Sequence, residues 1–156
     1  MSQFYKPQIF MKTFALICMM IGLGSLNAQQ AENGTLIIAK IEGQVKFYKA
    51  DGSELPANAY GEGDILPIGV SAETGQGASM LGILSNGTLM TMREKTRMKI
   101  GEFKQTPFDP GNQKLSDLQE EPSTSDVTID LNVGSLIIKT KKLNKRSNLD
   151  IHSPVG

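Results

Sequence analysis

The clearest pattern of hydrophobic and polar positions lies in residues 78–103. Two runs of alternating character flank Asn86-Gly87, and Asn-Gly is the strongest short-range signal for a two-residue hairpin loop, because both positions of a type I′ turn require a positive φ. A third run, residues 96–100, alternates so strictly that its even-numbered positions share one face and its two basic residues share the other. We therefore predict a three-stranded antiparallel meander with one solvated face, whose apolar face a second sheet must cover.

Strand signals also precede this region. Residues 37–47 carry apolar side chains at odd positions, with Gly43 on the apolar side, where a bulge or a close backbone approach uses glycine. Asp51-Gly52 follows and predicts a hairpin turn. Glycine and proline in residues 60–69 then limit the chain to a short, bent strand around residues 64–66.

The longest irregular segment spans residues 106–125. Its prolines and glycine break any regular element, although residues 115–121 are compatible with one short helical turn. Its acidic residues make it a candidate contact surface or cation-attracting surface, and a solvated loop is the simpler interpretation. Strands resume at residues 127–133, and two further short runs, 136–139 and 149–151, complete the pattern.

The many short strands and tight turns predict an all-β fold. The chain of 156 residues contains 16 glycines and no tryptophan, and aromatic residues make up 6% of it. Such a profile suits short strands joined by turns. An antiparallel β-sandwich and a jelly-roll-like double-stranded β-helix fit the strand pattern equally well. In either architecture, residues 106–125 form one long irregular loop.

The first 28 residues have the order of a secretory signal peptide. Lys6 and Lys12 precede an apolar run at residues 14–26, and Ala28 offers a small residue for cleavage. An uncleaved membrane anchor is the alternative, but a run of about 13 apolar residues is shorter than the ~20 that span a bilayer. We therefore expect an exported protein, periplasmic or at the cell surface, with no stable membrane span after cleavage.

Cleavage would leave a flexible N-terminus at residues 29–34 and a β domain at residues 35–156. The only cysteine, Cys18, leaves with the signal peptide, so the exported domain is expected to hold no disulfide and no thiol-based metal site. The leader removes two lysines and no acidic residue, so 14 basic residues remain against 16 acidic ones and the formal net charge changes from zero to −2. This balance gives no support for nucleic acid as a partner.

Residues suited to catalysis are scarce in the exported part. His152 is the lone histidine, so neither a histidine-based triad nor a multi-histidine metal site can be assembled. Asp150 and Ser153 lie beside it, yet at the end of a strand that frays easily. A pair of carboxylates could serve a glycosidase, but the chain has no tryptophan to stack a sugar ring. We predict no catalytic, cofactor-binding or metal-binding residue and no enzymatic activity.

The candidate contact residues gather near the C-terminal end of the sequence. A basic cluster at residues 139–146 could bind an anionic lipid or glycan surface, but it lacks the interleaved aromatic residues of a nucleic-acid platform. An exposed hairpin tip, or a charged edge that prevents sheet-to-sheet aggregation, explains the cluster more simply. The strand at residues 149–151 offers an edge for pairing with a partner. The candidate partner-binding residues are Lys139, Lys141, Lys142, Lys145, Arg146, Leu149 and Ile151.

Four short motifs follow one another along the chain. They are Gly43-x-Val45, Gly61-x-Gly63-Asp64-x-Leu66, Thr74-Gly75 and Ser85-Asn86-Gly87-Thr88. Their order resembles that of FecR-domain proteins, a family of exported, β-rich bacterial modules, and residues 103–110, 131–135 and 141–145 resemble stretches of its stand-alone members. The resemblance covers about residues 35–156. It implies a non-enzymatic domain that binds protein or senses a signal in the cell envelope.

Two departures limit what the resemblance implies. The family's founding member controls a sigma factor through a cytoplasmic segment, and the few residues before Phe14 cannot form one, so sigma regulation is not expected. Residues 153–156 fall where the family continues into another strand, so we expect a C-terminally short domain with an unpaired strand edge. The expected partner is an envelope protein that pairs with this edge, or a second copy of the chain. The alternative function is a structural or adhesin-like, glycan-binding surface module.

Overall fold

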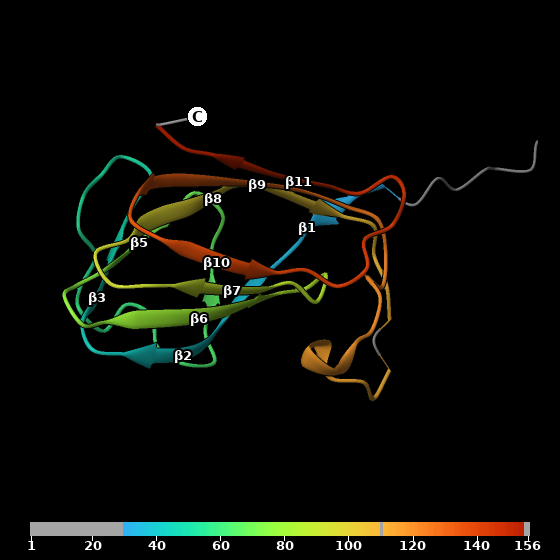
Figure 1. Ribbon diagram of the computed structural model, residues 1–156, viewed down its shortest axis with the longest axis horizontal. Coiled ribbons are helices and arrows are strands. Elements are labelled where there is room, and N and C mark those ends of the chain that lie inside the picture. Colours follow the sequence, from blue (N-terminus) through green and yellow to red (C-terminus); the bar gives the residue numbers. More distant parts are fainter. Residues whose placement is uncertain (1–29, 110, 155–156) are drawn as a thin grey trace, which may run out of the picture.

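The computed structural model of the chain describes residues 30–154 with the exception of residue 110. The signal peptide expected at residues 1–28, with Cys18, lies outside these residues. The described chain consists of short strands and one 3₁₀ turn, η1 (Leu115–Asp117), within the long irregular segment. The strands form two sheets that face each other (Figure 1).

The two sheets are called sheet A and sheet B. Sheet A consists of β1 (Glu32–Asn33), β3 (Val45–Tyr48), β5 (Ser71–Thr74), β8 (Arg97–Gln105), β9 (Ser125–Val133) and β11 (Asn148–His152). Sheet B consists of β2 (Leu36–Glu42), β4 (Ile65–Leu66), β6 (Ser79–Leu84), β7 (Leu89–Met92) and β10 (Leu136–Lys139). Sheet A has the order β11-β9-β8-β5-β3, with β1 paired to β8, and sheet B has the order β10-β7-β6-β2-β4. β1 lies in the segment expected to be a flexible N-terminus.

Hydrophobic side chains from the inner faces of both sheets form one continuous core. Phe47 is 1% exposed, and its ring meets that of Tyr60 edge-on at a centroid distance of 5.2 Å. This core confirms the predicted all-β, sandwich-like fold. Neighbouring strands are antiparallel as predicted, except that β11 pairs with β9 in parallel. The other fully buried large side chains are Leu36, Ile38, Leu66, Met80, Leu84, Met90, Met92, Met98, Phe103, Val127 and Ile129.

The hairpin predicted at Asn86-Gly87 is confirmed as the connection between β6 and β7. Its turn differs from type I′, because Gly87 has a positive φ of 85° whereas Asn86 does not. The N–H of Gly87 donates to the carbonyl of Leu84 at 2.8 Å, and the N–H of Leu84 donates to the carbonyl of Thr88 at 2.9 Å. The loop therefore has three residues, a tight turn followed by a glycine bulge.

The expected three-stranded meander is wrong, because its third run, β8, belongs to sheet A. Between β7 and β8 the chain turns at Lys95, which has a φ of 52°. The N–H of Thr96 donates to Thr74 Oγ1 at 3.0 Å, and the hydroxyl of Thr74 donates to the carbonyl of Arg93. These bonds tie the chain to β5, so the next strand continues in the sheet of β5. The alternation predicted for residues 96–100 is confirmed, since its even-numbered positions are buried.

The single strand expected over residues 37–47 is two strands in different sheets. In β2 the even-numbered residues Leu36 and Ile38 are buried, whereas the sequence predicted that the odd-numbered residues point inward. After a register shift between Ile38 and Lys40 the odd-numbered residues point inward, and they also point inward in β3. Gly43, with a φ of 75°, lets the chain pass from one sheet to the other, and a Cβ at this position would lie 2.9 Å from that of Ala78. The predicted close approach is therefore confirmed.

Other expected elements agree with the structure. The N–H of Leu55 donates to the carbonyl of Phe47 at 2.8 Å, which closes the hairpin predicted at Asp51-Gly52. β4 corresponds to the short strand predicted around residues 64–66, and η1 lies within the predicted helical turn at residues 115–121. In β9 the odd positions from Ser125 to Leu131 face the interior, as their pattern indicated, whereas Val133 at the end of the strand is 59% exposed.

Candidate functional site

The two C-terminal strands, β10 and β11, are the edge strands of sheets B and A and lie on the same side of the sandwich (Figure 1). The chain crosses from β9 to β10 at Gly134, which has a φ of 99° and lies so close to the backbone of Thr96 that a Cβ would overlap it. It crosses back to sheet A through residues 140–147. Among the described strands, each sheet therefore ends on this side with a strand that pairs along one edge alone.

The inner faces of β10 and β11 are only partly covered. Leu149 and Ile151 stand opposite buried residues of β9, so both point toward the interior, yet Ile151 is 46% exposed. Leu136 and Ile138 stand opposite buried methionines of β7 and are half-buried. Leu131 of β9 is half-buried in the same area. We call these five side chains the open side of the sandwich.

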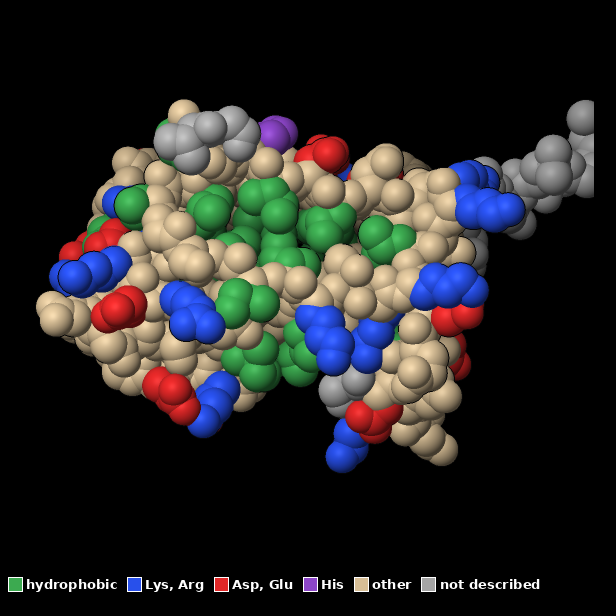
Figure 2. Space-filling model, in the orientation of Figure 1, with side chains coloured by type: hydrophobic (Ala, Val, Ile, Leu, Met, Phe, Trp, Pro, Cys, Tyr) green, Lys and Arg blue, Asp and Glu red, His purple; other side chains and the backbone are tan. Residues whose placement is uncertain are grey.

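The open side is a continuous apolar area. Figure 2 shows hydrophobic side chains gathered between β11 and β10 on this face. At the end near Gly134 the surface is hollowed into a depression of about 220 Å³, whose lining includes Leu131, Val133 and Pro154. Val133 is 59% exposed. Contiguous apolar surface of this kind marks an interaction site more often than scattered single residues do.

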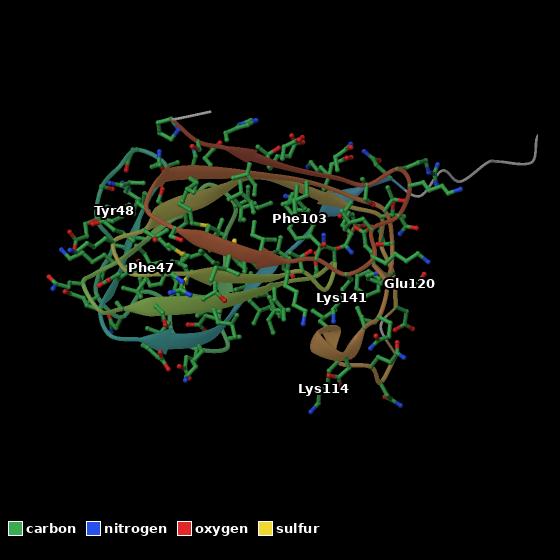
Figure 3. The ribbon with its side chains drawn as sticks, viewed as in Figure 1. Phe47, Tyr48, Phe103, Lys114, Glu120 and Lys141 are labelled. Carbon is green, nitrogen blue, oxygen red and sulfur yellow. The ribbon has the colours of Figure 1, made fainter. Side chains whose placement is uncertain are left out.

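The basic segment, residues 139–146, lies at the opposite end of the open side, because it joins the end of β10 to the start of β11. It is a crossover between the sheets and not the tip of a hairpin. Glu120 and Lys141 both lie at this end of the molecule (Figure 3). Lys142 Nζ lies 2.7 Å from Glu120 Oε1, and this hydrogen bond, reinforced by the negative charge of Glu120, raises the pKa of Lys142.

Three cations of the basic segment face solvent. Lys139, Lys145 and Arg146 are exposed and take part in none of the ion pairs found within residues 30–109 and 111–154. Lys139 ends β10, whereas Lys145 and Arg146 precede β11 by three and two residues. The structure thus brings the predicted cationic residues to one end of the apolar area that contains Leu149 and Ile151.

Glu121 anchors the basic segment from within, and no sequence pattern indicated this role. The residue is 6% exposed. Its Oε2 accepts the N–H of Asn144 at 2.8 Å and the hydroxyl of Ser147 at 2.6 Å, while its Oε1 accepts the hydroxyl of Ser125. Ser147 Oγ in turn accepts the N–H of Ser125 at 3.0 Å. The carboxylate therefore holds together the long irregular segment, β9 and the loop that leads into β11.

Asn86 extends this polar network to the turn between β6 and β7. Its Nδ2 donates to Ser125 Oγ at 3.0 Å, and its Oδ1 accepts the N–H of Thr88 at 3.0 Å. Asn86 and Thr88 are 2% and 1% exposed, so the N-x-T sequon that they form is inaccessible to glycan attachment in this fold. The network fixes the position of the basic segment relative to both sheets.

His152 lies on the outer face of sheet A, away from the open side. Its Nδ1 is 3.3 Å from Asp130 Oδ1, and Asp130 also pairs with Lys99 at 3.4 Å. The His152 side chain is 68% exposed. In the described part of the chain, no group of three or more His, Cys, Asp or Glu side chains is placed to hold a metal ion. The same part contains no helix that is long and apolar enough to cross a membrane.

No protein-family model, no curated protein and no solved structure matches this chain. The resemblance to FecR-domain proteins therefore rests on the order of motifs in the sequence. Two acidic residues within or beside those motifs have local roles in the turn before β4. Asp64 Oδ2 accepts the N–H of Gly61 at 2.8 Å, and Glu62 Oε1 accepts the N–H of Ile41 at 2.8 Å.

Proposed function

We propose that this chain is a non-enzymatic, exported FecR-like domain that acts as a protein-binding or signal-sensing module of the bacterial cell envelope. Its site of action is the periplasm or the cell surface, and its partner is an envelope protein. The proposal draws on the signal-peptide pattern, the order of motifs and the scarcity of catalytic side chains in the sequence. The partner binds by adding a strand to the edge of β11.

The edge position of β11 is the observation that carries this proposal. β11 pairs with β9 along one side, and among the strands of residues 30–109 and 111–154 the order of sheet A ends with it. A strand at the end of a sheet presents unpaired N–H and C=O groups on its outer side. An extended peptide can pair with these groups, because main-chain hydrogen bonds supply affinity without requiring particular side chains.

Two proline variants test strand addition at β11. Successive N–H groups of a strand point to opposite edges. One of the two variants Asp150→Pro and Ile151→Pro therefore removes an N–H that bonds to β9, and the other removes an N–H on the free edge. The variant with the smaller change in Tm identifies the free edge. That variant is expected to retain its envelope partner about tenfold less well than the wild type in a pull-down from the native host.

The controls separate the backbone from the side chain. Asp150→Ala and Ile151→Ala shorten the side chain but keep the N–H, so edge pairing predicts that both variants retain the partner better than the free-edge proline variant does. Equal retention by both proline variants and the wild type would contradict strand addition at β11. If the wild-type domain retains no envelope protein under any condition, the proposed function itself fails.

The exposed cations favour a second candidate function, a structural or adhesin-like module that binds glycans. Lys139, Lys145 and Arg146 offer positive charge to an anionic glycan. A triple substitution of these residues by Glu is expected to abolish binding on a glycan array, whereas Lys49→Glu in a distant loop is expected to leave it unchanged. An array on which the wild-type protein binds nothing would exclude this function.

A further inference from the structure

We propose that the partner inserts one extended strand between β11 and β10, antiparallel to β11, with apolar side chains at alternate positions and acidic residues at its C-terminal end. This inference rests on the proposed function, because it describes the segment that adds to β11. It goes further in naming the chemistry of that segment and its direction.

The alternation follows from the inward side chains of the two edge strands. A strand that continues sheet A beyond β11 points every second residue toward the interior. Ile151 is 46% exposed although it points inward, so these residues would cover it from the side of sheet A. Leu136 and Ile138 of β10 also point inward and are half-buried, so the same residues would pack against them from the side of sheet B. The remaining residues of the inserted strand would face solvent and can be polar.

The direction follows from the position of the basic segment. That segment joins the end of β10 to the start of β11, and Arg146 lies two residues before Asn148, within about 7 Å along the chain. A strand antiparallel to β11 therefore has its C-terminal end beside the basic segment. Antiparallel pairs outnumber parallel ones about two- to three-fold, so this direction is the better choice.

Charge complementarity gives the acidic end. Lys145 and Arg146, in the loop before β11, are exposed and form no ion pair within the described ranges. Lys142 is paired with Glu120, and Lys139 shares the outer face of sheet B with Ile137. Carboxylates at the C-terminal end of the inserted strand would meet Lys145 and Arg146, which favours one direction and one register. The depression at the other end of the open side is lined by uncharged residues, among them Gly134 and Pro154.

A second copy of the chain suits this position less well. Two β11 strands that pair antiparallel over all five residues, with Leu149 opposite Ile151 and both inward, place Asp150 opposite Asp150 of the other copy. Like charges directly opposite each other destabilise a strand pair. A shifted register with the same inward phase avoids this contact but leaves only three residues of each strand paired. A partner segment with alternating apolar residues and an acidic C-terminal end avoids this repulsion.

Synthetic peptides test the inference with the full protein. The probe is a fluorescent peptide of three Thr-Val repeats followed by three glutamates. One control has the glutamates at the N-terminal end, and the other has its three valines adjacent. Fluorescence anisotropy is expected to give a Kd for the probe that is about tenfold lower than for either control.

Two isoleucines provide a matched pair of variants. Ile151 and Ile137 are both 46% exposed, but Ile151 points toward the interior whereas Ile137 lies on the outer face of sheet B. Ile151→Asp is expected to weaken binding of the probe about tenfold or more, because it places a carboxylate against the apolar side chains of the peptide. Ile137→Asp is expected to leave the Kd unchanged.

The outcomes distinguish this inference from the proposed function. Equal binding of the three peptides, no binding up to about 1 mM, or equal effects of Ile151→Asp and Ile137→Asp would overturn it. If the free-edge proline variant loses the envelope partner while Ile151→Asp keeps it, edge pairing stands and insertion fails. Amide protection of β11 that rises with protein concentration, without any peptide, would assign the open side to a second copy and overturn the proposal.

Discussion

Glu121→Ala is expected to lower the free energy of unfolding by about 3 kcal/mol, because it leaves one buried and two part-buried hydrogen-bond donors without their acceptor. The carboxylate accepts the N–H of Asn144 and the hydroxyls of Ser147 and Ser125. Without it, the loop before β11 loses its attachment to the long irregular segment. Urea denaturation measures the change in stability, and amide exchange over residues 140–147 is expected to become faster.

The neighbouring residue provides the control for this prediction. Glu120 is exposed and pairs with Lys142 on the surface, and surface ion pairs contribute little to stability. Glu120→Ala is therefore expected to change the urea midpoint far less than Glu121→Ala does. Equal midpoints for the two variants would show that Glu121 does not anchor the basic segment.

Phe47→Ala is expected to lower the free energy of unfolding by about 3–5 kcal/mol, the usual cost of removing a buried aromatic side chain. Phe47 is 1% exposed and packs edge-on against Tyr60 in the core. The substitution removes apolar contacts and leaves a cavity that the two sheets cannot fully close. Thermal and urea unfolding monitored by circular dichroism measure the effect.

Tyr48, the next residue in β3, is the matched control because it points to the other face of the strand. It is half-buried, and the guanidinium carbon of Arg97 lies 4.2 Å from the centre of its ring. Tyr48→Ala is expected to cost about 1 kcal/mol, mainly through loss of this cation–π contact. A loss as large as that of Phe47→Ala would contradict the assignment of the two faces.

Local patterns in the sequence predicted the strands and turns well. Asn86-Gly87 and Asp51-Gly52 lie at hairpin turns, and residues 96–100 alternate as expected. These features depend on neighbouring residues, because turn chemistry and the two-residue period of a strand are local. The alternation near the end of the chain likewise indicated the site residues Leu149 and Ile151.

Features that depend on distant contacts could not be predicted in the same way. β8 lies in sheet A because Thr96 forms a hydrogen bond with Thr74 of β5. The alternating pattern of β8 by itself is equally compatible with a meander. The phase of β2 changes at a bulge that no sequence signal marks. Glu121 stands in an acidic stretch that suggests a solvated loop, and its partners Asn144 and Ser147 become its neighbours only when β11 joins sheet A.

The central proposal is that β11, the end strand of sheet A among the described residues, accepts a partner strand at its free edge, and amide hydrogen exchange tests it most directly. In the protein alone, some amides of residues 148–152 are expected to exchange faster than those of β8 and β9, which have neighbours on both sides. Adding the peptide with C-terminal glutamates is expected to slow that exchange. Amides of β11 that are as protected as those of β8 in the protein alone, and unchanged by the peptide, would contradict the claim.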